Sequence, residues 1–274
     1  MIVGTNLAVL IVAPILIPHT FNARAIAILA IALMVLITSA CGGGFWVLWK
    51  LGILVPASPH LDAIARAAAQ RAGIDMRGAF ELKASVANAA AFPIQRWVIF
   101  TSRALEVLTD AQVSAIFGHE LAHLSESRAV TILRVLTSVQ IVFVVVLIRP
   151  VMGEFGISGI TALMAFMVLV IIISRRIMRR MEERADKAAK AYEEEKGTYA
   201  LALERLYELD LLPAVVRSKR KIHPHLYDRM VAAGITPSFL RPAPPPRAPQ
   251  RLAIATAALT AVLLYALIFG LLLH

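Results

Sequence analysis

The residues with the clearest chemical potential are His119-Glu120-Leu121-Ala122-His123. On a helix, side chains four residues apart lie on one face, so the imidazoles of His119 and His123 can converge on one ion. Glu120 lies beside the first imidazole, where its carboxylate can take a proton from a water held at the metal. The spacing therefore predicts a zinc site for hydrolysis, with His119 and His123 as metal ligands and Glu120 as the catalytic base.

Two histidines leave such a site incomplete, because a catalytic zinc usually has three protein ligands and one open position. The segment Met181–Asp186 supplies candidates for the third ligand. Glu182 is the best of them, although Glu183 is a rival, since this charged run could equally be a solvated helix face. Asp186 follows Glu182 by one helical turn, so it could accept a ring N–H from a ligand histidine and fix its tautomer.

The composition of the chain indicates a membrane protein. Hydrophobic residues make up 59% of its 274 residues and charged residues only 17%, which is unlike a soluble globule. Five apolar segments approach the roughly 20 residues that a membrane-spanning helix needs; they are Ile2–Pro18, Ala25–Trp49, Val135–Ile148, Phe155–Ser174 and Leu252–Leu273. The third is short, so we expect its helix to begin before Arg134, whose side chain can snorkel to the interface.

The order of these spans places the polar segments together. Pro56–Arg128 and Arg175–Gln250 are separated by an even number of crossings, so both emerge on one side and can form a single domain. We therefore divide the chain into two transmembrane helices in 1–55, the first half of a protease domain in 56–128, a transmembrane hairpin in 129–174, the second half in 175–240, a proline-rich linker in 241–251 and a C-terminal transmembrane helix in 252–274.

Positive charge assigns a side to this domain. The formal net charge is +10, and Lys and Arg gather beside the domain ends of the spans, whereas only Arg24 and Arg149 belong to the opposite side. The positive-inside rule makes the domain cytoplasmic. No aromatic-rich recognition motif accompanies the basic residues, so we expect contact with the lipid bilayer and no nucleic acid as partner.

Local patterns predict how the helix that carries His119 and His123, here called the zinc helix, is positioned. Glu81–Val86 and Trp97–Thr101 are extended runs separated by the alanine-rich Asn88–Phe92, which predicts a small antiparallel sheet. Thr109 and Gln112 have the spacing of a capping box, so a helix begins there. The predicted fold is an α-helical membrane protein with about five transmembrane helices and a mainly α (α+β) domain that carries this sheet.

The combination of motifs resembles a known family. H-E-x-x-H, a two-span hairpin and then E-x-x-A-D, with Glu182 and Asp186, resembles the integral-membrane gluzincins, which include HtpX-type heat-shock proteases and CAAX prenyl proteases, and HtpX is the nearer type. Asn88–Phe92 resembles the family's substrate-binding edge strand. His223-Pro224 followed by Arg229 resembles its H-P…R element, whose histidine and arginine face the catalytic cleft.

The resemblance implies a zincin-like protease that acts on membrane or misfolded polypeptides in a bacterial inner membrane. It implies that Zn²⁺ is held by His119, His123 and Glu182, that Asp186 and Arg229 support these ligands, and that His223 is a catalytic donor to the oxyanion. Asn88, Ala89 and Ala90 would bind substrate.

Two readings compete with an endopeptidase. A membrane signalling receptor that retains the protease fold would need a sensor domain on the far side, where the links are only a few residues long. A catalytically silent zinc scaffold would need the metal ligands but not Glu120, whose presence therefore favours the enzyme.

Overall fold

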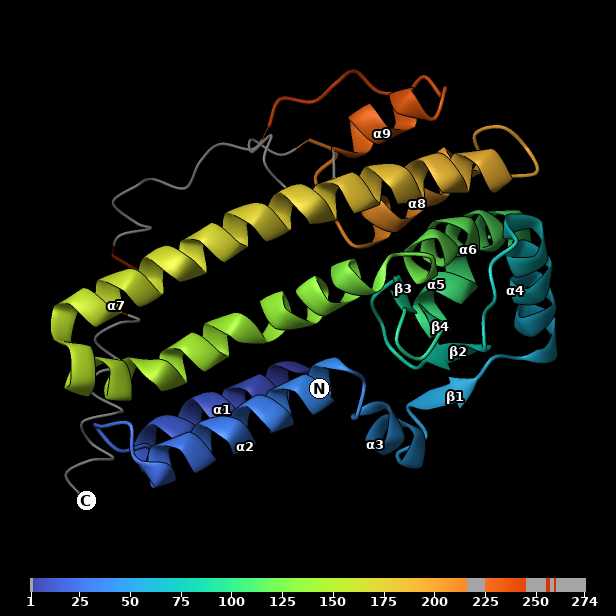
Figure 1. The fold of residues 1–274 in the computed structure, drawn as a ribbon. Coiled ribbons are helices and arrows are strands. Elements are labelled where there is room, and N and C mark those ends of the chain that lie inside the picture. The colour runs from blue at the N-terminus through green and yellow to red at the C-terminus, as the bar shows by residue number, and fades with distance from the viewer. Residues whose placement is uncertain (1, 216–224, 245–254, 257–258, 260–274) are drawn as a thin grey trace.

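The computed structural model describes residues 2–215, 225–244, 255–256 and 259. Its helices are α1 (Ile2–Leu16), α2 (Ala23–Ala40), α3 (Phe45–Lys50), α4 (Pro59–Ala72), α5 (Ser102–Val107), α6 (Asp110–Leu124), α7 (Arg128–Tyr192), α8 (Thr198–Leu209) and α9 (Leu226–Ala232), and its strands are β1 (Leu54–Pro56), β2 (Gly78–Leu82), β3 (Ala89–Phe92) and β4 (Trp97–Thr101). The apolar helices lie at one end of the molecule, and the sheet, α4, α5 and α6 lie at the other (Figure 1).

Helix α7 contains the predicted hairpin. Its path reverses at Gly156, where φ is 61° and ψ is −152°, a backbone conformation that glycine adopts without a side-chain penalty. Two long arms result, residues 128–155 and 157–192, and they return toward the same end of the molecule (Figure 1). The first arm begins at Arg128, before Arg134 as predicted, and the second continues past Glu182 without a break.

The number of membrane spans stays a prediction. Among the described residues, Ala23–Ala40 and Arg128–Tyr192 are long and apolar enough to cross a membrane, and Thr5–Leu16 is a shorter apolar helix. The second predicted span is not continuous, because α2 ends at Ala40 and Gly42, with φ of 88°, begins a turn before α3. Most of the fifth predicted span lies outside the described residues.

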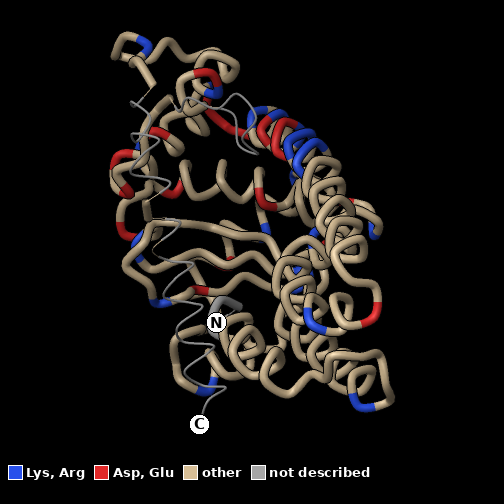
Figure 2. The backbone as a smooth tube through the Cα atoms, turned by 90° about the vertical axis from the view of Figure 1, so that its left-hand side faces the viewer, with Lys and Arg blue, Asp and Glu red and all other residues tan. Residues whose placement is uncertain are grey.

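The two short links predicted for the far side do lie together. Arg149 donates to the ring Nε2 of His19 at 2.8 Å and to the carbonyl oxygen of Pro14 at 3.1 Å. The rings of Phe21 and Phe155 are 6.1 Å apart. Figure 2 looks onto this end, where only isolated charged residues mark the turns. The links therefore close the bundle at the end opposite to the sheet.

The sheet differs from the prediction. Its order is β1-β2-β4-β3, and β2 pairs with β4 in parallel, so the sheet is mixed and the antiparallel prediction was wrong. The physical reason is the connection: residues 83–88 cross from β2 to the far edge, where β3 forms an antiparallel hairpin with β4, so β4 returns beside β2 in the parallel direction. Strand β2 also lies earlier than the predicted Glu81–Val86, ending at Leu82.

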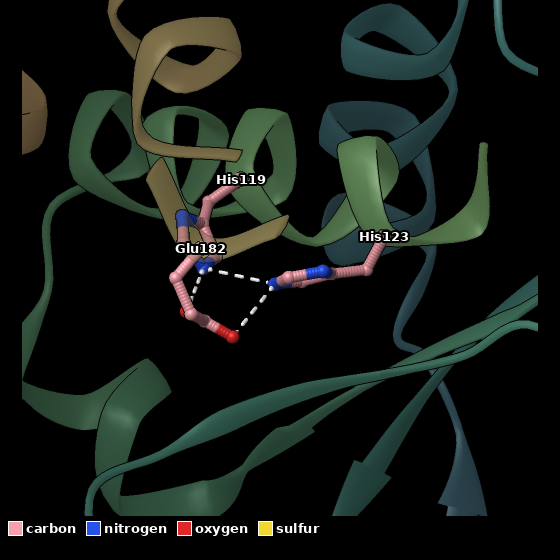
Figure 3. Close-up of side chains that lie close together, drawn as sticks. All are labelled: His119, His123 and Glu182. Atoms are coloured by element: carbon pink, nitrogen blue, oxygen red, sulfur yellow. Dashed lines mark hydrogen bonds and ion pairs between the residues drawn. The ribbon is translucent and has the colours of Figure 1, made fainter. Parts of the chain in front are cut away.

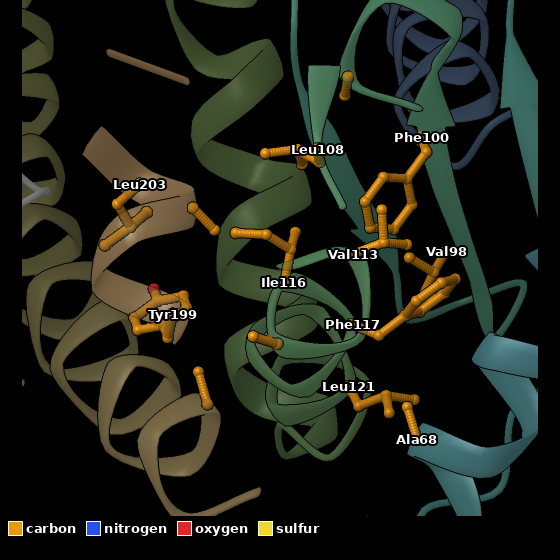
Figure 4. Close-up of a cluster of buried hydrophobic side chains, with 14 of the residues drawn as sticks. Ala68, Val98, Phe100, Leu108, Val113, Ile116, Phe117, Leu121, Tyr199 and Leu203 are labelled. Atoms are coloured by element: carbon orange, nitrogen blue, oxygen red, sulfur yellow. The ribbon is translucent and has the colours of Figure 1, made fainter. Parts of the chain in front are cut away.

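Helix α6 runs through the middle of the hydrophobic core. Phe117 packs against Phe100 of β4 with ring centroids 4.7 Å apart, while Ile116 faces Leu203 and Tyr199 of α8 (Figure 4). Every residue from Ala115 to Leu124 is buried. A helix buried on all sides has its position fixed by packing, and α6 carries the H-E-x-x-H motif.

Candidate metal centre

A capping box fixes the start of α6. The backbone N–H of Gln112 donates to the Thr109 hydroxyl at 3.3 Å, and that of Thr109 donates to the Gln112 side-chain oxygen at 3.0 Å. The prediction of this start is confirmed. The uninterrupted helix then sets the two imidazoles one turn apart, with the Nε2 atoms of His119 and His123 separated by 3.2 Å.

Gly118 allows the second arm of α7 to approach α6. A Cβ atom at this position would lie 3.3 Å from the Cα atom of Ala189, closer than side chains ordinarily pack. The glycine costs about 1 kcal/mol of helix propensity relative to alanine. The missing side chain lets the second arm of α7 pack closely against α6. This packing brings the arm that carries Glu182 next to the histidines.

Glu182 meets both histidines. Its Oε2 lies 3.6 Å from Nε2 of His119 and its Oε1 lies 3.5 Å from Nε2 of His123 (Figure 3). All three residues are buried, and one donor atom from each lies within 4.8 Å of the others. Glu183, the rival, instead pairs with Arg179 at 3.0 Å and leaves 46% of its side chain exposed. The structure therefore brings Glu182, and not Glu183, to the histidines.

This donor set suits a catalytic zinc ion. Two imidazole nitrogens and one carboxylate supply three ligands and leave a position for water or substrate. Burial of the three side chains, with exposures of 8%, 8% and 4%, also fits a cation, because a buried carboxylate requires compensating charge. In the part of the chain that the structure describes, this is the cluster of His, Cys, Asp or Glu residues with metal-binding geometry.

The outer nitrogen of His119 is held by residues from two further helices. Its Nδ1 lies 2.7 Å from the Tyr199 hydroxyl and 3.2 Å from Oδ1 of Asp186. The hydroxyl donates its own hydrogen bond to Asp186 at 2.7 Å. Toward His119 it therefore acts as the acceptor of a hydrogen bond from Nδ1–H. In the neutral ring this arrangement keeps the proton on Nδ1 and leaves the Nε2 lone pair for a metal ion, which is the tautomer that metal binding requires.

Arg229 completes this network from α9. Its guanidinium donates to both carboxylate oxygens of Asp186, at 2.6 and 2.8 Å, and to the Tyr199 hydroxyl at 2.8 Å. Burial alone would raise the pKa of Asp186, but hydrogen bonds from His119 and Arg229 hold that pKa well below its ordinary value. The pair is therefore ionised, and its charges compensate each other inside the protein.

The charge around His119 also affects its protonation. Burial lowers the pKa of this imidazole, but hydrogen bonds to Asp186 and Glu182 outweigh burial and raise the pKa to about 9. The metal-free ring is then protonated at neutral pH. A cation that binds its Nε2 must displace a proton, so metal affinity falls as the pH falls.

The outer ring nitrogen of His123 is held by a separate pair of residues that lie close to it in the sequence. Its Nδ1 lies 2.7 Å from Oε1 of Glu126, and the same oxygen accepts from the Arg134 guanidinium at 2.7 Å. Arg134 was predicted to snorkel to a membrane interface, and in the structure its guanidinium reaches Glu126 next to the zinc helix. Glu126 lies in the link between α6 and α7.

Sequence reasoning missed Tyr199, Glu126 and the pairing of Arg134. Tyr199 is 80 residues from His119, and a lone tyrosine in a helix has no spacing that connects it to a metal motif. Glu126 did offer a signal, since it follows His123 by three residues. The helix ends at Leu124, so helical spacing does not predict on which side of the chain the Glu126 side chain lies.

The predicted substrate residues border a cleft at this cluster. The cleft has a volume of about 400 Å³, and Glu120, Asn88, Ala89 and Ala90 line it together with the three clustered side chains. Strand β3, which carries the alanines, is an edge strand of the sheet. Leu203, Leu206 and Tyr207 of α8 add apolar surface. His223, the predicted oxyanion donor, lies outside the described residues.

Comparison with known proteins identifies the family. Residues 57–244 match the profile of peptidase family M48, and this range contains the zinc helix, both arms of α7 and α9. No curated protein matches the chain significantly. The match covers more than half of the sequence and includes the His–His–Glu cluster, whose donors suit the zinc on which M48 metallopeptidases typically depend. The chain therefore belongs to peptidase family M48, a family of metallopeptidases.

Proposed function

We propose that this chain is a membrane-embedded, zinc-dependent endopeptidase of the HtpX type. The observation that carries the proposal is the placement of Glu120 in the cleft beside the buried His–His–Glu cluster. A cluster that only stabilised the fold would need the three ligands. It would not need a further carboxylate beside them in an accessible cleft.

His119, His123 and Glu182 would hold the zinc ion. When bound, zinc acts as a Lewis acid that polarises a peptide carbonyl and lowers the pKa of a water toward about 7. The three side chains are already gathered and buried. Their arrangement therefore costs little reorganisation when the ion binds.

Glu120 moves the proton in this reaction. Its carboxylate accepts a proton from the attacking water as the oxygen bonds to the carbonyl carbon of the substrate. Glu120 then delivers that proton to the amine nitrogen as the peptide C–N bond breaks, which restores the carboxylate. His223 would donate a hydrogen bond to the oxyanion, a contribution worth about 3 kcal/mol.

Strand β3 offers a binding edge for an extended polypeptide. The carbonyl oxygen of Asn88 accepts from the Thr101 N–H at 2.9 Å, so the backbone of Asn88 faces β4. Backbone groups alternate in direction along a strand, and those of Ala89 therefore point to the free edge. Substrate could add there as a further strand, with small alanine side chains leaving it room.

Membrane embedding rests on the surface of the helices. Ile132 and Ile141 on the first arm of α7 are 58% and 57% exposed, and Phe166 on the second arm is 63% exposed. Apolar surface of this extent is typical of contact with lipid or another protein. With basic residues concentrated at the domain end, the cleft would open on the cytoplasmic side of a bacterial inner membrane, where membrane or misfolded proteins are the proposed substrates.

Replacing the base tests the proposal. Glu120→Gln keeps the size of the side chain but cannot accept the proton, so we expect cleavage of a labelled unfolded casein to fall by about 100- to 10,000-fold. Zinc content, measured on the same purified protein in detergent, should stay at the wild-type value. Undiminished cleavage by Glu120→Gln would sink the mechanism.

A further inference from the structure

Glu126 is a buried carboxylate that the catalytic mechanism does not use. It lies in the link between α6 and α7, and only 1% of its side chain is exposed. One of its oxygens, Oε1, accepts from both His123 Nδ1 and Arg134 Nη2, each at 2.7 Å. The carboxylate therefore joins a zinc-site histidine to the first arm of α7.

Burial of the Glu126 carboxylate is costly, whereas 37% of the Arg134 side chain is exposed. A buried carboxylate without a compensating charge destabilises a protein. The guanidinium of Arg134, 2.7 Å from Oε1 of Glu126, supplies the compensating charge. Even so, Oε2 of Glu126 and Nε of Arg134 are buried without a hydrogen-bond partner in the described residues. A buried carboxylate that served only stability would be better replaced by an apolar side chain, so its contact with His123 Nδ1 points to a role at the metal centre.

That role follows from the chemistry of imidazole. A carboxylate that accepts from Nδ1–H fixes the tautomer in which the Nε2 lone pair is available to a metal, and it holds the ring in place. In His123 this Nε2 faces Glu182 at 3.5 Å. We propose that Glu126, held by Arg134, is the positioning residue for His123 as a zinc ligand. The proposal rests on the proposed zinc site.

The pair also connects the metal centre to the hairpin. Arg134 belongs to the first arm of α7, and Glu182 belongs to the second. The two arms therefore contact the metal cluster through different residues: the second arm supplies Glu182, and the first supplies Arg134, which holds Glu126. A displacement of the first arm would move the carboxylate that orients His123.

Zinc affinity tests this role without any use of cleavage. Competition of full-length, detergent-solubilised protein with a chromophoric zinc chelator should show about 10- to 100-fold weaker binding for Glu126→Ala. Glu126→Gln retains an oxygen that can accept from Nδ1–H, so its loss should be smaller. The matched control is Glu106→Ala, which removes an exposed carboxylate paired with Arg103 at 2.9 Å and should bind zinc as the wild type does.

A second measurement separates positioning from general stability. The spectrum of Co²⁺ bound in place of zinc should change in Glu126→Ala, because the ring of His123 is no longer held, while a change that affects only stability leaves the spectrum of the folded protein unaltered. If Glu126→Ala does not fold, Arg134→Lys and Arg134→Gln carry the test. Lysine keeps the compensating charge, so it should bind zinc more tightly than the glutamine variant.

The outcomes distinguish this proposal from the proposed function. Wild-type zinc affinity and an unchanged cobalt spectrum in Glu126→Ala would overturn the positioning role alone. Absence of zinc binding by the wild-type chain would overturn the proposed function as well.

Discussion

The two histidines of the motif are supported in different ways. Around His119, the network draws on Asp186 of α7, Tyr199 of α8 and Arg229 of α9, so it forms only when the second half of the domain has packed. Around His123, a carboxylate just beyond the end of the zinc helix is held by an arginine a short distance along the chain.

The two supports nevertheless use the same chemistry. In each, a carboxylate that faces the outer ring nitrogen is compensated by an arginine, from Arg229 for Asp186 and from Arg134 for Glu126. The difference lies in redundancy, because His119 has a hydroxyl and a carboxylate within reach, whereas His123 has one carboxylate oxygen. The comparison teaches that His123 is the ligand whose support a single substitution removes.

The largest effect is expected from breaking the charge pair on the His119 side. Arg229→Ala removes the guanidinium that contacts both Asp186 oxygens and leaves His119 as the remaining cationic partner, which should lower the free energy of unfolding by about 3 kcal/mol. Chemical denaturation of the metal-free protein in detergent measures this change. The matched control is Arg241→Ala, whose pair with Asp228 at 3.3 Å is about half exposed on both sides and should contribute about 0–1 kcal/mol. Equal destabilisation by the two variants would contradict the buried pair.

A smaller effect is expected from removing one of the two partners of His119. Tyr199→Phe deletes the hydroxyl but leaves Asp186 Oδ1 at 3.2 Å from Nδ1, so zinc affinity should fall by about 1 kcal/mol, or roughly fivefold. Chelator competition measures this in parallel with Glu126→Ala, which should bind zinc more weakly still. If Tyr199→Phe binds zinc more weakly than Glu126→Ala, His119 does not have the more redundant support and the comparison is wrong.

The smallest effect is expected at β3, which belongs to neither support. Ala89→Pro removes an N–H from the free edge, where proline is tolerated, and should raise KM for an unfolded polypeptide by about 2- to 3-fold through one lost, solvent-accessible hydrogen bond. Ala89→Ser keeps the N–H and is the control. Steady-state kinetics at equal zinc content measure both, and identical KM values for the two variants would argue against substrate binding along this edge.

The sequence predicted the residues of the metal cluster from one periodicity and from the order of the helices along the chain. Helical spacing puts His119 and His123 on one face, and the helical hairpin of α7 returns Glu182 to the end of the molecule that holds α6. The hairpin turn and the extension of the first arm past Arg134 followed from the same reasoning. The choice of Glu182 over Glu183 also relied on the family resemblance, whereas the other features depend on local pattern and chain order.

What sequence reasoning missed depends on tertiary packing. The parallel pairing of β2 with β4 required the intervening chain to cross to the far edge, and an alanine-rich segment carries no signal for that choice. Tyr199 reaches His119 only because α8 packs on α6, and Arg134 reaches Glu126 only because the chain turns between α6 and α7. The second predicted span breaks near Gly42, where φ is 88°.

Zinc content of two neighbouring variants tests the central claim, that the metal centre joins α6 to the second arm of α7. Glu182→Ala removes the carboxylate that lies within 3.6 Å of both histidines, whereas Glu183→Ala removes the adjacent, half-exposed carboxylate that pairs with Arg179. Metal analysis of the purified proteins should find the wild-type amount of zinc in Glu183→Ala and a loss of zinc in Glu182→Ala. Wild-type zinc content in Glu182→Ala would contradict the centre described for this protein.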